Sequence, residues 1–361
     1  MSFTFTADKS ALSAVLASVS KVANPSFIAL FGYVHVAAEK GKMYATGSDG
    51  DVTIQMPLAA STDDHDAAGL LPRVAIDYIA KLPAGLVTVK IDNATVAVTS
   101  GRRSASFTTA ASDDYTKPSW PETEPVEISG CELAAALDTV LFAASSDTAR
   151  AVLTGVLFEA DSDKLTVVAT DTYRLSAQTF PLGTSIAETR VVVPAKALST
   201  LRRFLVEGTQ VKFSADFPAA SFVVGDVKIR ARLVAGDFPK WSMVMPSGDG
   251  MSIEVDSSEL SDALSRLALL SRDKVVRFTT GEGVVTLSAA GQDIGNGDEV
   301  IDATISGAAG EAFALNAAYL SQALGVLGGN VTLTSVGGLK PIVLSSAANP
   351  DLKMVQMPIR V

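Results

Sequence analysis

The chain has 361 residues, of which 48% are hydrophobic and 19% are charged, a composition typical of folded domains rather than of disordered segments. Its 39 acidic side chains outnumber its 29 basic ones, and the formal net charge of -10 gives no general attraction for nucleic acid or anionic membranes. Any polyanion would therefore have to meet a local basic surface.

The first residues, 1–6, alternate as in a β-strand and lack the basic start and apolar run of an export signal. The single cysteine, Cys131, excludes an intrachain disulfide framework and fits a reducing compartment. The uncharged stretch 312–339 is interrupted by polar residues and glycine pairs, so it predicts a helix and a strand instead of a membrane span. We therefore expect a cytoplasmic protein with no membrane segment.

Two helical patterns recur three times along the chain, at a spacing of about 122 residues. The second pattern ends each time close to a glycine that can cap a helix, and a short alternating strand follows it. A period of this length is too long for a solenoid and has the size of a whole domain. The recurring apolar positions are Leu12, Val15 and Leu16, then Leu133, Ala136 and Leu137, then Leu260, Ala263 and Leu264 in the first helix, and Leu82, Leu205 and Leu327 at the end of the second.

Two polar segments with several prolines or glycines, 112–126 and 246–250, separate the repeats. They predict three homologous domains at 1–124, 125–248 and 249–361. Each domain contains a helix and several strands twice over, so we predict an α+β fold in which helices cover one face of largely antiparallel sheets. Six such half-units in a row predict a curved or ring-like body.

The common catalytic and nucleotide-binding motifs are missing from the sequence. His65 lies in the acidic loop 63–66, where a solvated turn is favoured over a metal site because no second imidazole or thiolate is near. Cys131 has no histidine close in sequence, and Asp147 and Asp171 are better explained by two surface turns than by acid/base chemistry. We therefore predict no catalytic residue, no metal site and no cofactor.

Basic side chains recur on the second helix of the repeats. The helix predicted at 194–205 places Lys196 and Arg203 opposite its apolar stripe, and the equivalent helix of the first domain carries Arg73 and Lys81. A solvated helix face is the simpler explanation for any one of them. Their repetition favours a surface that faces phosphates without sequence preference.

Several segments strongly resemble the bacterial DNA polymerase III β subunits, the sliding clamps. The likeness extends over the whole chain, in its length, its three repeats and its final residues. The segments that carry it are LTGVLFE at 153–159, VATDTYRL at 168–175, VPAK at 193–196, ARLVAGDFP at 231–239 and VQMPIRV at 355–361.

The resemblance implies a head-to-tail homodimer whose six domains close around duplex DNA, with helices lining the hole and sheets outside. Such a ring would be a non-catalytic processivity factor, held on DNA by enclosure and free to slide because phosphate contacts are weak and non-directional. Its implied partners are duplex DNA of any sequence, the replicative polymerase, the clamp loader and other proteins with a clamp-binding motif. Neither a cofactor nor a membrane is implied.

The resemblance also implies a pocket for partner peptides between the second and third domains. Apolar side chains around one arginine would form a slot with a polar rim. Many relatives have Gly-His where this chain has Thr172-Tyr173, and a basic residue where it has Met243, so a different peptide preference is expected. Ile359 and Val361 also replace Met and Leu. The expected pocket residues are Leu153, Thr170, Thr172, Tyr173, Arg174, Leu175, Pro239, Val244, Asn316, Tyr319, Met357, Pro358 and Ile359.

Two further surfaces follow from matching positions. Arg73, Lys196 and Arg203 match basic positions on inner helices and are expected to face DNA. The dimer seam is expected where the strand around Phe107 meets Leu269 and Leu270 of the other subunit. For the three seam residues, ordinary core packing is the alternative.

Two other functions compete with a clamp. A metabolic enzyme or small-molecule-binding protein built from α+β repeats would need a convergent polar pocket with a perturbed acid or histidine, and the sequence supplies no such set. A structural shell protein would form open-ended oligomers that grow with concentration, which sedimentation distinguishes from a closed dimer.

Overall fold

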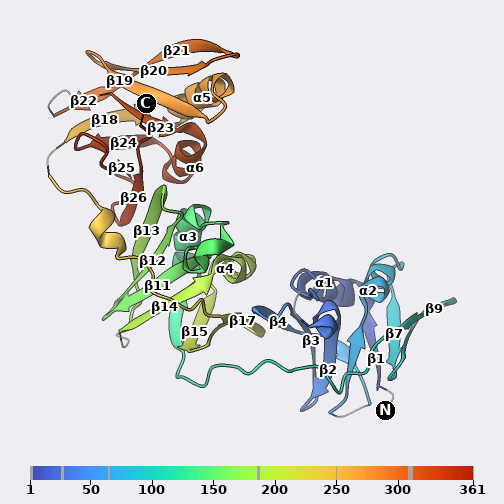
Figure 1. Cartoon of the computed structure of the whole chain (residues 1–361). Coiled ribbons are helices and arrows are strands. Elements are labelled where there is room, and N and C mark those ends of the chain that lie inside the picture. The colour runs from blue at the N-terminus through green and yellow to red at the C-terminus, as the bar shows by residue number, and fades with distance from the viewer. Residues whose placement is uncertain are drawn as a thin grey trace. The chain divides into compact units, whose positions relative to one another are not determined.

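The computed structural model of the chain is shown in Figure 1. His65 and Val361, which were discussed above, lie outside the residues it describes. The described residues are 3–25, 28–63, 66–184, 188–248, 250–307 and 312–360.

The described residues form two compact bodies, one comprising 1–131 and 196–233 and the other 132–195 and 234–361. These limits differ from the predicted domain limits because strands from neighbouring repeats share sheets, as the pairing of β17 with β4 and of β13 with β26 shows. The division into three domains therefore stays a prediction. Within each body every strand pairing is antiparallel, as expected for the predicted α+β class.

The first body contains a five-stranded and an eight-stranded sheet. The five-stranded sheet runs in the order β5 (Ala60–Ser61), β1 (Phe3–Asp8), β7 (Leu86–Ile91), β8 (Thr95–Ser100) and β9 (Arg103–Thr108). The eight-stranded sheet runs in the order β10 (Val126–Ser129), β15 (Gln210–Asp216), β16 (Ala219–Val224), β17 (Val227–Arg232), β4 (Val52–Pro57), β3 (Lys42–Ser48), β2 (Val34–Glu39) and β6 (Ala68–Leu71).

Helices α1 and α2 of the first body contact each other, and α1 also contacts β3 and β4 (Figure 1). Helix α1 begins where the Asp8 carboxylate accepts hydrogen bonds from the amides of Ser10 and Ala11, and it buries Leu12 and Leu16. The helices of this body are α1 (Lys9–Val19), η1 (Ala29–Gly32), α2 (Arg73–Ala80) and, apart from its first residue, α4 (Ala195–Arg202).

Segment 109–125 lies against the eight-stranded sheet. The Tyr115 ring stacks on His35 of β2 at 4.6 Å, and Lys117 pairs with Glu39 of the same strand at 2.9 Å. Further along, the carbonyl of Ser119 accepts a hydrogen bond of 2.7 Å from Arg230 Nε. His35 and Tyr115 are both buried at this contact.

The second body contains a nine-stranded and a four-stranded sheet. The nine-stranded sheet runs in the order β14 (Thr189–Pro194), β11 (Gly155–Asp161), β12 (Lys164–Thr170), β13 (Arg174–Pro181), β26 (Leu352–Gln356), β25 (Ile342–Ser345), β24 (Asn330–Ser335), β18 (Met251–Asp256) and β22 (Thr304–Ser306). The four-stranded sheet runs in the order β21 (Gly295–Asp302), β20 (Val284–Gly291), β19 (Val275–Thr280) and β23 (Phe313–Asn316).

Helices α5 and α6 of the second body also contact each other and bury apolar stripes against one core (Figure 1). Asp256 and Asn316 cap them by accepting hydrogen bonds from backbone amides of their first turns. No described helix combines the length and the apolar character needed to cross a membrane. The helices of this body are α3 (Gly130–Val140, apart from its first two residues), η2 (Leu141–Ala143), η3 (Thr148–Thr154), η4 (Trp241–Val244), α5 (Ser257–Leu267), η5 (Ala268–Leu270) and α6 (Ala317–Leu327).

Candidate functional site

The turn between β12 and β13 is held by one carboxylate. Asp171 Oδ1 accepts hydrogen bonds of 3.0 Å from the backbone amides of Tyr173 and Arg174, and its Oδ2 accepts one of 2.9 Å from Arg174 Nε. With these bonds the carboxylate fixes both the backbone of the turn and the direction of the arginine. Asp171 was expected in a surface turn. The turn is present, but the side chain is only 12% exposed.

Thr172 occupies the left-handed region of this turn, with φ of 78°. The first repeat contains the same turn 122 residues earlier, where Asp49 accepts hydrogen bonds from the amides of Asp51 and Val52. There the equivalent residue is Gly50, with φ of 96°. Since a β-branched residue is disfavoured at positive φ, Thr172 stores strain that the Asp171 hydrogen bonds must offset.

Arg174 connects the turn to α6. Its guanidinium carbon lies 4.4 Å from the centre of the Tyr319 ring and 5.2 Å from that of Phe142, and Nη1 donates a hydrogen bond to Gln322 Oε1. With the ion pair to Asp171, these contacts leave the Arg174 side chain 12% exposed. The Arg174 side chain is thus fixed in place, and the Asp171 carboxylate balances its charge. Its guanidinium lies between the rings of Tyr319 and Phe142.

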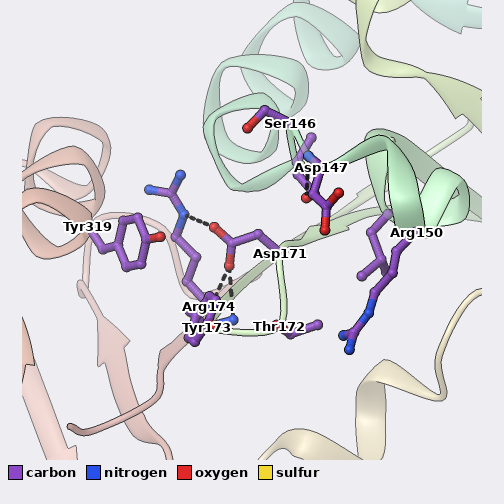
Figure 2. A pocket seen from close by; sticks show the side chains of 11 residues that line it. Ser146, Asp147, Arg150, Asp171, Thr172, Tyr173, Arg174 and Tyr319 are labelled. Carbon is purple, nitrogen blue, oxygen red and sulfur yellow. Dashed lines mark hydrogen bonds and ion pairs between the residues drawn. The ribbon is translucent and has the colours of Figure 1, made fainter.

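A cavity of about 420 Å³ opens beside this turn. Figure 2 shows Arg174 between Asp171 and Tyr319, with Arg150 on the opposite side from Tyr319. The Tyr173 side chain at the rim is 61% exposed, and its ring centre is 6.3 Å from that of Tyr319. Its lining is largely polar and charged and includes the Tyr173 and Tyr319 rings and Leu153, so the cavity suits a peptide that places an apolar side chain against the rings and bonds to the polar groups through its backbone. Its lining residues are Ala144, Ser145, Ser146, Asp147, Arg150, Leu153, Asp171, Thr172, Tyr173, Arg174 and Tyr319.

The structure brings five of the expected pocket residues together around this cavity: Leu153, Thr172, Tyr173, Arg174 and Tyr319.

Four more expected residues support the walls. Thr170 Oγ1 donates a hydrogen bond of 2.7 Å to the carbonyl of Arg174, and Leu175 is buried in the core below. Asn316 caps α6, the helix that carries Tyr319. Met357 donates its backbone amide to the carbonyl of Tyr173 at 2.8 Å.

The remaining expected residues lie farther along the chain end or on a separate segment. The amide of Ile359 bonds to the carbonyl of Ala314, and Pro358, between Met357 and Ile359, is half-buried. Pro239 and Val244 are exposed on the segment around η4, outside the residues that line the cavity. Membership of a peptide site stays a prediction for the whole set.

Sequence reasoning did not assign several other side chains to this site. Asp147 and Arg150 line the cavity, and Phe142 and Gln322 contact Arg174. Asp147 was interpreted as part of a surface turn, and its Oδ1 does accept the Ala149 amide at the start of η3. No local pattern distinguishes Phe142 or Gln322 from ordinary helix residues, since their role depends on an arginine far away in the chain.

The three residues expected to face DNA are exposed in the first body, Arg73 on α2, Lys196 on α4 and Arg203 directly after α4, and the first two are paired with acids. Arg73 Nε lies 3.2 Å from Asp77 Oδ1, and the Lys196 ammonium pairs with the buried carboxylate of Asp49. Within the part of the chain that the structure describes, Arg203 donates to the backbone carbonyl of Thr200, at 3.5 Å, and forms no ion pair. Phosphates would therefore compete with existing partners at two of the three positions.

The expected seam residues lie on an edge strand in one case and in a short helix in the other, since Leu269 and Leu270 belong to η5. Phe107 lies on the edge strand β9, partly buried, with its ring centre 5.5 Å from that of Tyr78. Leu269 is 77% exposed, whereas Leu270 is partly buried against the core of the second body.

The second body has its own edge strand, β21, which carries Glu299. Arg266 donates two hydrogen bonds to the Glu299 carboxylate, at 2.8 and 2.5 Å. These bonds lower the pKa of Glu299, so its charge is retained well into acid.

Comparison with known families decides what these features belong to. Residues 127–240 match the family described as DNA polymerase III beta subunit, central domain, and residues 242–360 match the C-terminal domain of the same subunit. The chain belongs to the DNA polymerase III beta subunit family. Members of this family are the non-catalytic beta subunit of DNA polymerase III. The chain is therefore a processivity factor and not an enzyme, as predicted.

Similarity to individual clamps extends over nearly the whole chain. The beta sliding clamp of Staphylococcus aureus is 26% identical over 344 residues, covering 91% of each chain, and that of Escherichia coli K12 is 26% identical over 340 residues, covering 92%. The DnaN sliding clamp of Pseudomonas aeruginosa, solved bound to griselimycin, superposes with a TM-score of 0.91 at 25% identity and covers 100% of both chains. The Bacillus subtilis clamp superposes at 0.94 with 23% identity, which confirms the predicted clamp fold.

Proposed function

We propose that this clamp closes around duplex DNA as a head-to-tail homodimer and tethers DNA polymerase through the cavity beside Arg174. The observation that carries the proposal is the built cavity, in which Asp171 fixes a strained turn and an arginine between aromatic rings. Fixing a turn in this way costs stability, and functional sites are where proteins keep such strain.

Ring closure is supported by two complementary sheet edges. Among the described strands, β9 has a partner on one side only, and so has β21. The edge at β9 carries Arg102 and Arg103, while β21 carries Asp298, Glu299 and Asp302. Unpaired edges invite another strand, and opposite charges select the partner and its direction.

Apolar side chains accompany this edge. Leu269, Ile294 and Val300 are 77%, 46% and 59% exposed around β21. In a head-to-tail dimer each edge would meet its complement on the other subunit, with Phe107 against Leu269 and Leu270, and the ring would leave no open end.

DNA would be held by enclosure, with Arg73, Lys196 and Arg203 supplying weak phosphate contacts that do not depend on sequence. The acidic net charge suits this function, because tight electrostatic binding over the whole surface would slow sliding. We place this activity in the cytoplasm, in a chain of three homologous domains at 1–124, 125–248 and 249–361.

The cavity would take short peptides from the replicative polymerase, from the clamp loader and from other proteins with a clamp-binding motif. Its site would extend from the lining residues along Met357, Pro358 and Ile359, whose segment bonds to the Tyr173 carbonyl. With Tyr173 and Tyr319 on one wall, a peptide that inserts an apolar or aromatic side chain is favoured.

Retention on DNA of different topology tests the ring. Clamp loaded on nicked circular DNA should stay bound through gel filtration and should leave once a restriction enzyme linearises the circle. Clamp that leaves both forms equally fast would contradict enclosure. A Leu269→Asp variant, which places a charge in the seam, should behave as a monomer in sedimentation and should not be retained.

Peptide binding tests the cavity separately. A fluorescent peptide from the polymerase should lose most of its affinity for the double variant Met357→Ala/Pro358→Ala, while the dimer mass stays unchanged. Met56→Ala, in the first body, serves as a control of the same chemistry. Equal affinity for both variants would remove the C-terminal segment from the site.

A further inference from the structure

The second helices of the repeat differ sharply in charge although their apolar stripes are conserved between repeats. Leu198 of α4 and Leu320 of α6 are 122 residues apart, and both are fully buried. At the same spacing, two exposed cations are lost: Lys196 of α4 corresponds to Ala318, and Arg203, the residue directly after α4, corresponds to Gly325. Helix α6 carries no charged side chain anywhere in its range.

The first helices follow the same division. Helix α1 of the first body contains Lys9 and no acid. In the second body, α3 and α5 contain four acids and a single cation, Arg266, whose guanidinium is already bonded twice to Glu299. The acids are Glu132, Asp138, Glu259 and Asp262.

We propose that phosphate contact in this clamp is confined to the helices of the first body, and that α3, α5 and α6 form a sector that the DNA backbone avoids. The inference rests on the proposed encirclement of DNA and adds which helices hold the duplex. Since exposed charges act only over a Debye length of about 8 Å at physiological salt, the field that a phosphate meets at a helix is set mainly by the charged side chains of that helix. A phosphate close to α5 would meet Glu259 and Asp262 with no available cation.

The division has a consequence for partner binding. The cavity beside Arg174 lies in the same body as α3, α5 and α6, and α6 supplies Tyr319 to the lining and Gln322 as a partner of Arg174. A duplex held by the first body leaves these elements to the partner peptide.

Cross-linking from equivalent serines tests the proposal. Ser199 of α4 and Ser321 of α6 are 122 residues apart, and Ser265 gives an exposed position on α5. The background is the full chain with Cys131→Ser, and each serine is replaced by cysteine in a separate variant. Each variant is labelled with a photoreactive maleimide and illuminated in the presence of a short linear duplex, onto which a ring can thread. Covalently closed circular DNA without loader, which a closed ring cannot thread, is the control.

We expect cross-links from Ser199→Cys at least about tenfold more often than from Ser321→Cys or Ser265→Cys, after normalising to the label measured by mass spectrometry. Equal yields from the three positions would overturn the division while leaving encirclement intact. Cross-links from none of them, or equal yields with the closed circle, would refute encirclement itself.

A graft provides a second readout. Ala318→Lys/Gly325→Arg restores the α4 pattern on α6, where an added Cβ at Gly325 meets no atom within 4 Å. The slope of log K against log salt should steepen by up to about 1.8, or about 0.9 for each new phosphate contact. Ala318→Gln/Gly325→Gln is the uncharged control, and an equal slope for both variants would contradict the proposal that missing cations are what keep phosphates away from α6.

Discussion

Replacing Arg73, Lys196 and Arg203 together with alanine should make DNA binding less sensitive to salt. Each phosphate contact contributes about 0.9 to the slope of log K against log salt, so three contacts would reduce it by about 2.7. Arg73 and Lys196 are already paired with Asp77 and Asp49, whereas Arg203 forms no ion pair with a described residue, so the reduction has a lower bound of about 0.9.

These bounds convert into a measurable ratio. Between about 50 and 200 mM salt, a slope change of 0.9 to 2.7 alters the loss of affinity by about 3-fold to about 40-fold. Fluorescence anisotropy with a labelled duplex at several salt concentrations measures both slopes directly.

The matched control removes three exposed lysines from strands: Lys90→Ala, Lys164→Ala and Lys353→Ala. Both triple variants change the net charge equally, so any effect of overall charge appears in both. Equal slopes for the two variants would refute the assignment of the helix cations to DNA contact.

Four further predictions concern stability, each measured by urea unfolding. Burial lowers the pKa of His35 to about 4, so the folded chain resists a proton that the unfolded chain binds below pH 6.5. Stability should therefore fall by about 2 kcal/mol from pH 8 to pH 5, and His35→Phe should remove this part of the pH dependence. The buried Tyr115 hydroxyl has no hydrogen-bond partner among the described residues, so Tyr115→Phe should stabilise the chain by about 1 kcal/mol, and a loss of stability would contradict this. Thr172→Gly should exceed Thr172→Ala in stability by about 1 kcal/mol because φ is positive there, and the reverse order would refute the strain. Asn316→Ala should cost about 1 kcal/mol through loss of the α6 cap, with Asn316→Asp close to the parent chain.

Part of the candidate site could be predicted from the sequence and part could not. Thr172, Tyr173 and Arg174 belong to one short segment, so a resemblance in that segment carries all three at once. Gln322 is 148 residues from Arg174, and nothing in the local sequence of α6 indicates that it bonds to an arginine. The strain at Thr172 was also invisible, because threonine by itself indicates a strand and not a left-handed turn.

The sequence by itself determined the repeats, the α+β class, the helices and the family, because periodicity, capping and family motifs act within short stretches of chain. Only the tertiary structure decided that strands of neighbouring repeats share sheets, that Lys196 pairs with Asp49 across 147 residues, and that Asp171 locks Arg174 against Tyr319. The physical reason is that ion pairs and ring contacts between distant segments depend on how the sheets and helices pack, and one sequence without its fold does not specify which side chains meet.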